Sequence, residues 1–230
     1  MTLQEAIMLR HSVRRYVHKP LSAEIVETLR KKIEECNAEG GLHIQLVTNE
    51  TRAFTGLFSY GKFSGVENYI VMVGRKADDL DERVGYYGEQ LVLLAQTLGL
   101  NTCWAGLSYR RVDEAYSVGN DEKLTCMIAL GYGATQGHKR KSKTAEQVSN
   151  VGSESPEWFR KGVEAVLMAP TAINQQKFSF TLLPQEQGTG DKPKVLAKRG
   201  FSMVGYTKMD LGIARLHFEI GAGTENFDWA

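Results

Sequence analysis

RHSVRRY (residues 10–16) and APTAINQQ (residues 169–176) are the two stretches of sequence that decide the fold, and each occurs once. The first combines three arginines with a small hydroxyl side chain. The second places a proline, a threonine and an asparagine in a short polar turn. If both stretches belong to one site, the fold has to bring opposite halves of the chain together.

Length and composition indicate a globular protein. The chain has 230 residues, of which 42% are hydrophobic and 24% charged, and these values are typical of a folded protein with a substantial core. The formal net charge is +1, whereas a general nucleic-acid binder usually carries a strong basic excess. We therefore expect no nucleic-acid partner.

The sequence predicts neither a signal peptide nor a membrane span. The N-terminal residues MTLQEAIM lack a basic stretch followed by an apolar one. The longest apolar run, residues 91–98, is shorter than the roughly 18 residues of a membrane span. Cys36, Cys103 and Cys126 are too widely spaced for a disulfide framework or a zinc site. We expect a cytoplasmic protein with no membrane partner and no metal.

Apolar periodicity, caps and glycines predict alternating helices and strands. The prediction for the first half is a helix from residue 3 with a capping box at residues 2–5, a helix between Ser22 and Gly40, strands at 42–48 and 68–74, a helix at 80–98, a strand at 102–105, a helix at 111–118 and a strand at 125–131. The prediction for the second half is a helix with Ser155 as N-cap and Pro156 in its first turn, a strand at 178–183 and a helix at 210–220 ended by Gly221.

The two halves resemble each other in the order of their elements. Residues 131–154 are rich in glycine, lysine and serine and are predicted to form a long surface connection. After it, Val163 and Leu167 repeat the spacing of Leu29 and Ile33, and the order helix, turn, strand, connection, helix, glycine recurs. We interpret this as a degenerate duplication; chance similarity between amphipathic helices is the alternative.

The basic residues of the first stretch are candidates for anion binding. A guanidinium donates paired hydrogen bonds to phosphate, Arg10 and Arg14 are four residues apart, and Ser12 between them adds a hydroxyl donor. If the stretch closes a helix, both arginines can point to one side. A second basic cluster, HKRKSK at residues 138–143, could complete the pocket. A solvated basic segment is the alternative for each.

The second stretch is predicted to form a stiff turn after a helix. Proline fixes its own φ and lacks a donor, so Pro170 restricts the turn while Thr171 and Asn174 present hydrogen-bonding groups. Such a turn could lie against a flat ligand. An ordinary helix-to-strand connection is the alternative.

Four stretches together resemble the FMN-dependent nitroreductase family. Residues 10–16 resemble its Arg-x-Ser-x-Arg-x-Tyr signature, and residues 169–176 resemble its Pro-Ser-x-x-Asn turn. Residues 98–106 (LGLNTCWAG) resemble the segment that passes over the flavin ring, and residues 129–133 (ALGYG) resemble its Leu-Gly-Tyr-Pro stretch. The resemblance covers nearly the whole chain and implies an α+β, nitroreductase-like fold with a mainly antiparallel central sheet flanked by helices.

The order of these motifs is similar to that of a subgroup in which two such folds are fused in tandem. Ordinary members carry the Pro-Ser turn just after the second helix and form homodimers with each flavin between the subunits. Here that early position, residues 36–41, lacks the turn, which instead follows the apparent duplication. The resemblance implies two degenerate copies, residues 1–150 and residues 151–230, in one monomeric chain that mimics the homodimer.

The resemblance assigns FMN contacts residue by residue. The residues expected around the phosphate, the ribityl chain and the pyrimidine edge are Arg10, His11, Ser12, Arg14, Arg140, Lys141 and Lys143. The residues expected around the ring are Ala105, Gly106, Pro170, Thr171, Ala172 and Asn174. Because the second half lacks a phosphate signature, we expect one FMN per chain.

The function implied by the resemblance is that of an FMN-dependent oxidoreductase. It would use NAD(P)H to reduce nitroaromatic, quinone or similar electron-poor small molecules by two-step hydride transfer through FMN. Because the cofactor carries this chemistry, no catalytic side chain is expected; His43, His217 and Cys103 are interpreted as structural. The alternatives are another flavin reaction such as dehydrogenation or dehalogenation, non-catalytic FMN binding for storage or sensing, and a flavin-free anion-binding domain.

Overall fold

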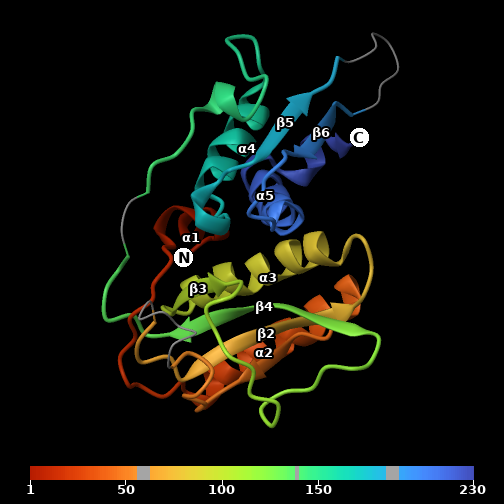
Figure 1. Cartoon of the computed structure of the whole chain (residues 1–230). Coiled ribbons are helices and arrows are strands. Elements are labelled where there is room, and N and C mark those ends of the chain that lie inside the picture. The colour runs from red at the N-terminus through yellow and green to blue at the C-terminus, as the bar shows by residue number, and fades with distance from the viewer. Residues whose placement is uncertain (56–62, 138–139, 185–191) are drawn as a thin grey trace.

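The computed structural model in Figure 1 describes residues 1–55, 63–137, 140–184 and 192–230. The helices are α1 Leu3–Leu9, α2 Ala23–Gly40, α3 Leu80–Thr97, α4 Glu157–Met168 and α5 Thr207–Ala222, with single 3₁₀ turns η2 Ala145–Gln147, η3 Ala172–Asn174 and η4 Thr224–Asn226. The strands are β1 Gln45–Val47, β2 Asn68–Arg75, β3 Asn101–Ala105, β4 Glu122–Gly131, β5 Phe178–Leu182, β6 Lys194–Arg199 and β7 Asp228–Trp229. No helix within the described ranges has both the length and the apolar composition needed to cross a membrane.

The strands form two sheets. The larger sheet has the order β1-β2-β4-β3, and every neighbouring pair in it is antiparallel. In the smaller sheet, β5 pairs antiparallel with β6, and β7 pairs parallel with β6. The predicted α+β class with a mainly antiparallel sheet is confirmed.

The larger sheet is buried on both faces, which explains why its central strands are continuously apolar. Alternate side chains of a strand point to opposite faces, so Ile70 and Met72 of β2 join the helix-side core with Leu29 of α2. The alternate residues Tyr69 and Val71 join a second cluster, in which loop residues such as Phe54 and Phe63 cover the opposite face of the sheet. One face is therefore covered by helices, and the other by connecting segments.

Helix α3 separates the larger sheet from an upper part that contains α4, α5, β5 and β6 (Figure 1). Glycines permit this close packing of α3 against α5. A Cβ added at Gly85 would overlap the carbonyl oxygen of Met209, and one added at Gly212 would overlap that of Glu82. The backbones of the two helices thus meet without intervening side chains.

The upper part repeats an arrangement of the lower part. The order α4, β5, β6, α5 follows the order α2, β1, β2, α3, and in both series the two strands pair antiparallel. The sequence correspondence between residues 29–33 and 163–167 falls on α2 and α4.

Local signals predicted the helix starts well. The capping box at Thr2 and Glu5 and the Ser22 cap are present, and Gly41 ends α2 in the left-handed conformation with φ +57. Helix α4 begins one residue later than predicted: Pro156 is its N-cap, while the Ser155 hydroxyl accepts a hydrogen bond from the backbone N–H of Gly152.

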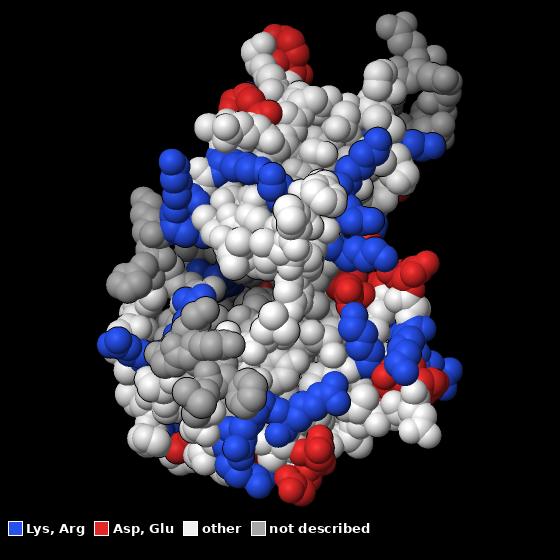
Figure 2. Space-filling view, in the orientation of Figure 1, with Lys and Arg blue, Asp and Glu red and all other residues white. Residues whose placement is uncertain are grey.

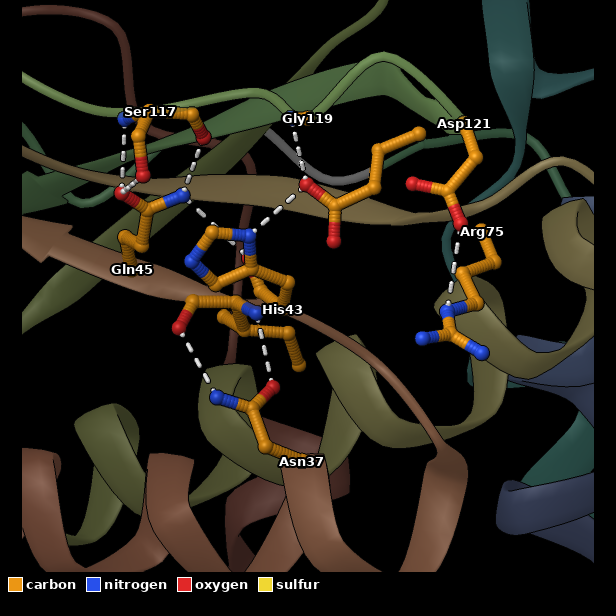
Figure 3. Close-up of polar contacts among 9 residues, drawn as sticks. Asn37, His43, Gln45, Arg75, Ser117, Gly119 and Asp121 are labelled. Atoms are coloured by element: carbon orange, nitrogen blue, oxygen red, sulfur yellow. Dashed lines mark hydrogen bonds and ion pairs between the residues drawn. The ribbon is translucent and has the colours of Figure 1, made fainter.

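The helix predicted at residues 111–118 is wrong, because these residues form a turn at 113–115 followed by irregular chain. The Gln45 side chain accepts a hydrogen bond from the backbone N–H of Ser117 and donates one to its carbonyl. Beyond it, Glu122 accepts a bond from Gly119 and contacts Nδ1 of His43 at 2.9 Å (Figure 3). Side chains of neighbouring elements therefore replace helical hydrogen bonds here.

Two other parts of the prediction differ from the structure. Helix α5 continues through Gly221, which lies where α4 approaches: a Cβ there would lie 2.5 Å from the Lys161 carbonyl oxygen. Gly223, with φ +78, ends the helix instead. Strands β6 and β7 were not predicted, because the β6 sequence KVLAKR is short and largely basic.

The crossing of α3 and α5 gives the first prediction. Gly85→Ala and Gly212→Ala each place a methyl group against backbone that cannot rotate away, so each variant should lose at least about 1–3 kcal/mol of unfolding free energy. Gly152→Ala is the matched control, since no atom lies within 4 Å of its added Cβ. Denaturant unfolding measures the difference; equal stabilities of all three variants would contradict the glycine-mediated contact.

Candidate functional site

The first basic stretch is extended rather than helical. Helix α1 ends at Leu9, and Arg10 already has an extended conformation with ψ 138. The N–H of Val13 donates to the Thr102 carbonyl at 3.0 Å, which lays the stretch along the edge strand β3. Arg10 and Arg14 therefore share one side through the alternation of an extended chain, and not through a helix as the sequence suggested.

The second stretch forms a tight turn after α4. Three of its non-glycine residues, Ile173, Asn174 and Gln176, have positive φ values of 45, 59 and 46. The carboxylate of Asp210 holds the turn by accepting hydrogen bonds from the Ala172 N–H at 2.9 Å and the Gln175 amide at 2.7 Å. Backbone strain of this kind persists only where surrounding contacts determine it.

Arg140 links the end of α4 to the turn. Its guanidinium donates to the Leu167 carbonyl at the end of α4, at 2.5 Å, and to the side-chain oxygen of Asn174 at 3.1 Å. Burial, followed by the repulsion of Arg10, lowers the pKa of Arg140 to about 10, while Glu89 opposes the shift. Within the described part of the chain, no carboxylate forms an ion pair with Arg140 or Arg10.

Two neighbouring cavities lie at this junction. One, of about 670 Å³, is lined mainly by the basic stretch, Arg140 and the end of α4. The other, of about 360 Å³, is lined by the end of β3, the turn and the start of α5. The walls they share are Ser12, Arg14, Pro170, Thr171 and Ile173. In the space-filling view, basic side chains border a hollow between the lower and upper parts of the molecule (Figure 2).

Most residues assigned to FMN by the resemblance line these cavities. Those in the larger cavity are Arg10, His11, Ser12, Arg14, Arg140, Pro170, Thr171 and Asn174. Ala105, Gly106 and Ala172 line the smaller one. The structure thus brings together residues from opposite ends of the sequence; their role toward a cofactor stays a prediction.

Lys141 and Lys143 line neither cavity. The ammonium group of Lys143 donates to the Gln176 carbonyl at 2.6 Å, and burial, followed by the charge of Lys177, lowers its pKa. The Lys141 carbonyl accepts a hydrogen bond from Asn174. Both lysines therefore support the turn through the contacts seen here. The remaining members of the basic cluster, residues 138 and 139, lie outside the described residues.

Several cavity residues had no signal in the sequence. The smaller cavity is lined by Tyr206, Met209 and Asp210, beside Trp104 of the stretch at residues 98–106. Tyr206 has a positive φ of 60 and covers Gly106, where an added Cβ would lie 2.6 Å from the tyrosine ring. A glycine and an aromatic residue far apart in sequence therefore pack together, and the sequence around either residue does not predict this contact.

The smaller cavity contains a thiol that carries no charge. Burial raises the pKa of Cys126 to about 12, and its sulfur contacts the sulfur of Met209 at 3.8 Å. Burial also raises the pKa of Cys103. Since the thiolate is the reactive form, neither thiol is poised as a nucleophile, as expected for cysteines that act as small buried side chains.

The family model described as "Putative TM nitroreductase" matches residues 2–222. The chain belongs to this nitroreductase family. None of the curated proteins compared matches it.

Three solved structures are similar to the chain. A "putative nitroreductase" from Thermotoga maritima is 24% identical, with a TM-score of 0.62, and the match covers 96% of this chain and 83% of that one. A "putative nitroreductase in complex with FMN" from Desulfovibrio desulfuricans is 16% identical, with a TM-score of 0.51 and coverages of 68% and 98%. Nitroreductase A from Vibrio parahaemolyticus is 16% identical, with a TM-score of 0.53 and coverages of 68% and 78%. At these identities, the structures establish the nitroreductase-like fold.

Asp210 gives a prediction on pH dependence. Burial raises the pKa of its carboxyl group from 3.8 to about 6, so the folded chain binds this proton more tightly than the unfolded chain. The resulting stabilisation is complete at low pH and is lost as the pH rises through about 6. Relative to Asp210→Asn, the wild type should lose about 2–3 kcal/mol of unfolding free energy between about pH 4 and pH 7.

The difference in pH slope, measured by denaturant unfolding at each pH, is the readout. The absolute stabilities are less informative, because an asparagine would also rearrange the hydrogen bond to Gln175. If the unfolding free energies of the wild type and of Asp210→Asn changed in parallel with pH, the raised pKa of Asp210 would be contradicted.

Proposed function

We propose that this nitroreductase-family protein is an FMN-dependent oxidoreductase. It would take electrons from NAD(P)H and reduce nitroaromatic, quinone or similar electron-poor molecules. The observation that carries the proposal is the meeting of the basic stretch, residues 10–14, with the strained turn, residues 170–174, around two cavities with shared walls. The first stretch supplies donors for a phosphate, and the second supplies a stiff surface for a ring.

The donor set fits a phosphate group. Arg140 is half-buried, its hydrogen-bond partners are neutral oxygens, and Arg10 lies close enough to lower its pKa. Two half-buried positive charges without an ion-pair partner favour an anionic ligand, because charge-assisted hydrogen bonds to phosphate are strong. The Ser12 hydroxyl stands beside them in the same cavity.

The smaller cavity suits a flat aromatic ring. Trp104, Met209 and Ile213 give it apolar walls, and the backbone at Ala105 and Gly106 brings polar groups to its edge. Bound FMN would supply the two-electron chemistry that amino-acid side chains lack. The chain would orient the ring between β3 and the turn. Ile173, which is 77% exposed at the cavity wall, leaves an apolar entrance for the nicotinamide and the acceptor.

We also propose that one chain holds one FMN and mimics a homodimer. Helices α2 and α4 correspond in sequence, and an arginine donates to a carbonyl at the end of each helix. At α2 this is Arg83, which forms an ion pair with Asp79, and the Tyr87 ring packs over Gly40. The positive charge is thus already neutralised and the space filled, which supports a single site at the end of α4.

The flavin content of the purified protein tests this proposal. We expect a flavin absorption spectrum at one FMN per chain, and turnover of a nitroaromatic or a quinone with NADH or NADPH. Two FMN per chain would refute the single site. Tight FMN binding without reduction by either nicotinamide would indicate storage or sensing. Failure to take up added FMN would refute flavin binding and leave an anion-binding domain.

Arg10→Ala tests the phosphate contact. Removing one charge-assisted hydrogen bond should cost about 1.5–3 kcal/mol of FMN binding, a roughly 10- to 150-fold higher Kd. Arg15→Ala is the matched control, because Arg15 belongs to the same stretch but is exposed and lines neither cavity. Fluorescence titration with FMN measures both. Equal affinities of the two variants would remove Arg10 from the site.

A further inference from the structure

A fully buried polar cluster lies behind the smaller cavity. Glu89 on α3 and His217 on α5 are both 0% exposed, and Oε1 of Glu89 lies 3.0 Å from Nε2 of His217. The other carboxyl oxygen of Glu89 accepts a hydrogen bond from the indole N–H of Trp104 at 2.9 Å. Nδ1 of His217 lies 3.0 Å from the carbonyl oxygen of Ala165 on α4. The cluster joins four elements from both parts of the molecule.

These contacts fix how many protons the cluster holds. A backbone carbonyl only accepts hydrogen bonds, so Nδ1 of His217 carries a proton. The contact between Nε2 and Glu89 then requires one further proton, either on the ring or on the carboxyl group. A ring protonated only at Nδ1 beside an ionised carboxylate would place two lone pairs 3.0 Å apart. Both permitted forms have zero net charge, which suits complete burial.

The indole ring of Trp104 is held at two places. Glu89 binds the ring nitrogen, and the six-membered ring packs through Cη2 and Cζ2 on Gly88, where an added Cβ would overlap the indole. Trp104 itself lines the smaller cavity, and the next two residues, Ala105 and Gly106, form the cavity edge. A shift of the indole would therefore move the backbone that faces the proposed position of the flavin ring.

We propose that Glu89 and His217 share one proton and act as positioning residues, which hold Trp104 and the backbone of residues 105–106 at the flavin ring. The part of this proposal that concerns the flavin ring rests on the proposed FMN site. The hydrogen-bonding scheme predicts that one substitution of Glu89 preserves the position of Trp104 and another does not. A glutamine at residue 89 accepts from Trp104 through its oxygen and donates to a neutral His217 through its nitrogen. A methionine of similar length does neither.

The test compares Glu89→Gln with Glu89→Met. The matched control is Glu82→Met, because Glu82 lies on the same helix and also binds a residue of α5, Arg215, without contacting Trp104. FMN affinity, the absorption spectrum of the bound flavin and the thermal midpoint are measured for each full-length chain. We expect Glu89→Met to bind FMN about tenfold more weakly, the equivalent of about 1.4 kcal/mol, with a shifted flavin band. Glu89→Gln and Glu82→Met should retain the wild-type spectrum.

Each outcome decides the proposal. A Glu89→Met chain that is less stable but has unchanged FMN affinity and spectrum would reduce the cluster to a purely structural role. A Glu89→Gln chain as impaired as Glu89→Met would show that the carboxylate charge, rather than the shared proton, is required. If Glu89→Met does not fold, Trp104→Phe, which removes the indole donor together with the five-membered ring, should shift the flavin band; an unchanged band would overturn the positioning role.

A wild-type chain that binds no FMN would instead refute the proposed function. The hydrogen-bonding scheme is then tested on the flavin-free chain by the thermal midpoints. Glu89→Gln should unfold at a higher temperature than Glu89→Met, and equal midpoints would overturn the shared proton.

Discussion

Backbone contact between α3 and α5 is the constraint on which the rest of the structure depends. The basic stretch is attached to β3, whereas the turn is attached to α4 and α5. Neither segment has enough regular structure to hold its own geometry. Their relative position is therefore set where the two parts of the molecule pack, at Gly85 and Gly212. Because the helices meet backbone to backbone, a small change in side-chain volume there would separate the two walls of the site.

The electrostatics of the site follow from the end of α4. The last carbonyls of a helix attract cations, and Arg10 and Arg140 donate to the carbonyls of Met168 and Leu167. These bonds orient the guanidinium groups but leave their charge largely uncompensated, since a carbonyl carries only a partial charge. Side chains fixed before a ligand arrives lose less entropy on binding. The helix end thus orients two cationic groups, as the proposed phosphate site requires.

Sequence patterns predicted those features that depend on neighbouring residues. Caps and apolar spacing located α1, α2 and α3, and residue chemistry singled out both site stretches. The pairing of Glu89 with His217 was not predictable, because Glu89 looks like an ordinary charged residue on a helix and its partner lies on another helix. Asp210 and Tyr206 were missed for the same reason. The error at residues 111–118 arose because Gln45, a distant residue, supplies the hydrogen bonds that a helix would have made.

The strain in the turn gives a reason for such rigid packing. Each non-glycine residue in a sparsely populated conformation costs on the order of 1–3 kcal/mol, and Ile173, Asn174 and Gln176 all have positive φ. The turn keeps this shape because Asp210 on α5 and Arg140 hold it from two sides. The half-buried ion pair of Arg215 with Glu82 joins two long, flexible side chains, which can follow a sliding of α5 along α3. A backbone contact and a buried pair that must share a proton resist sliding, so the strained turn and the basic stretch move as one unit.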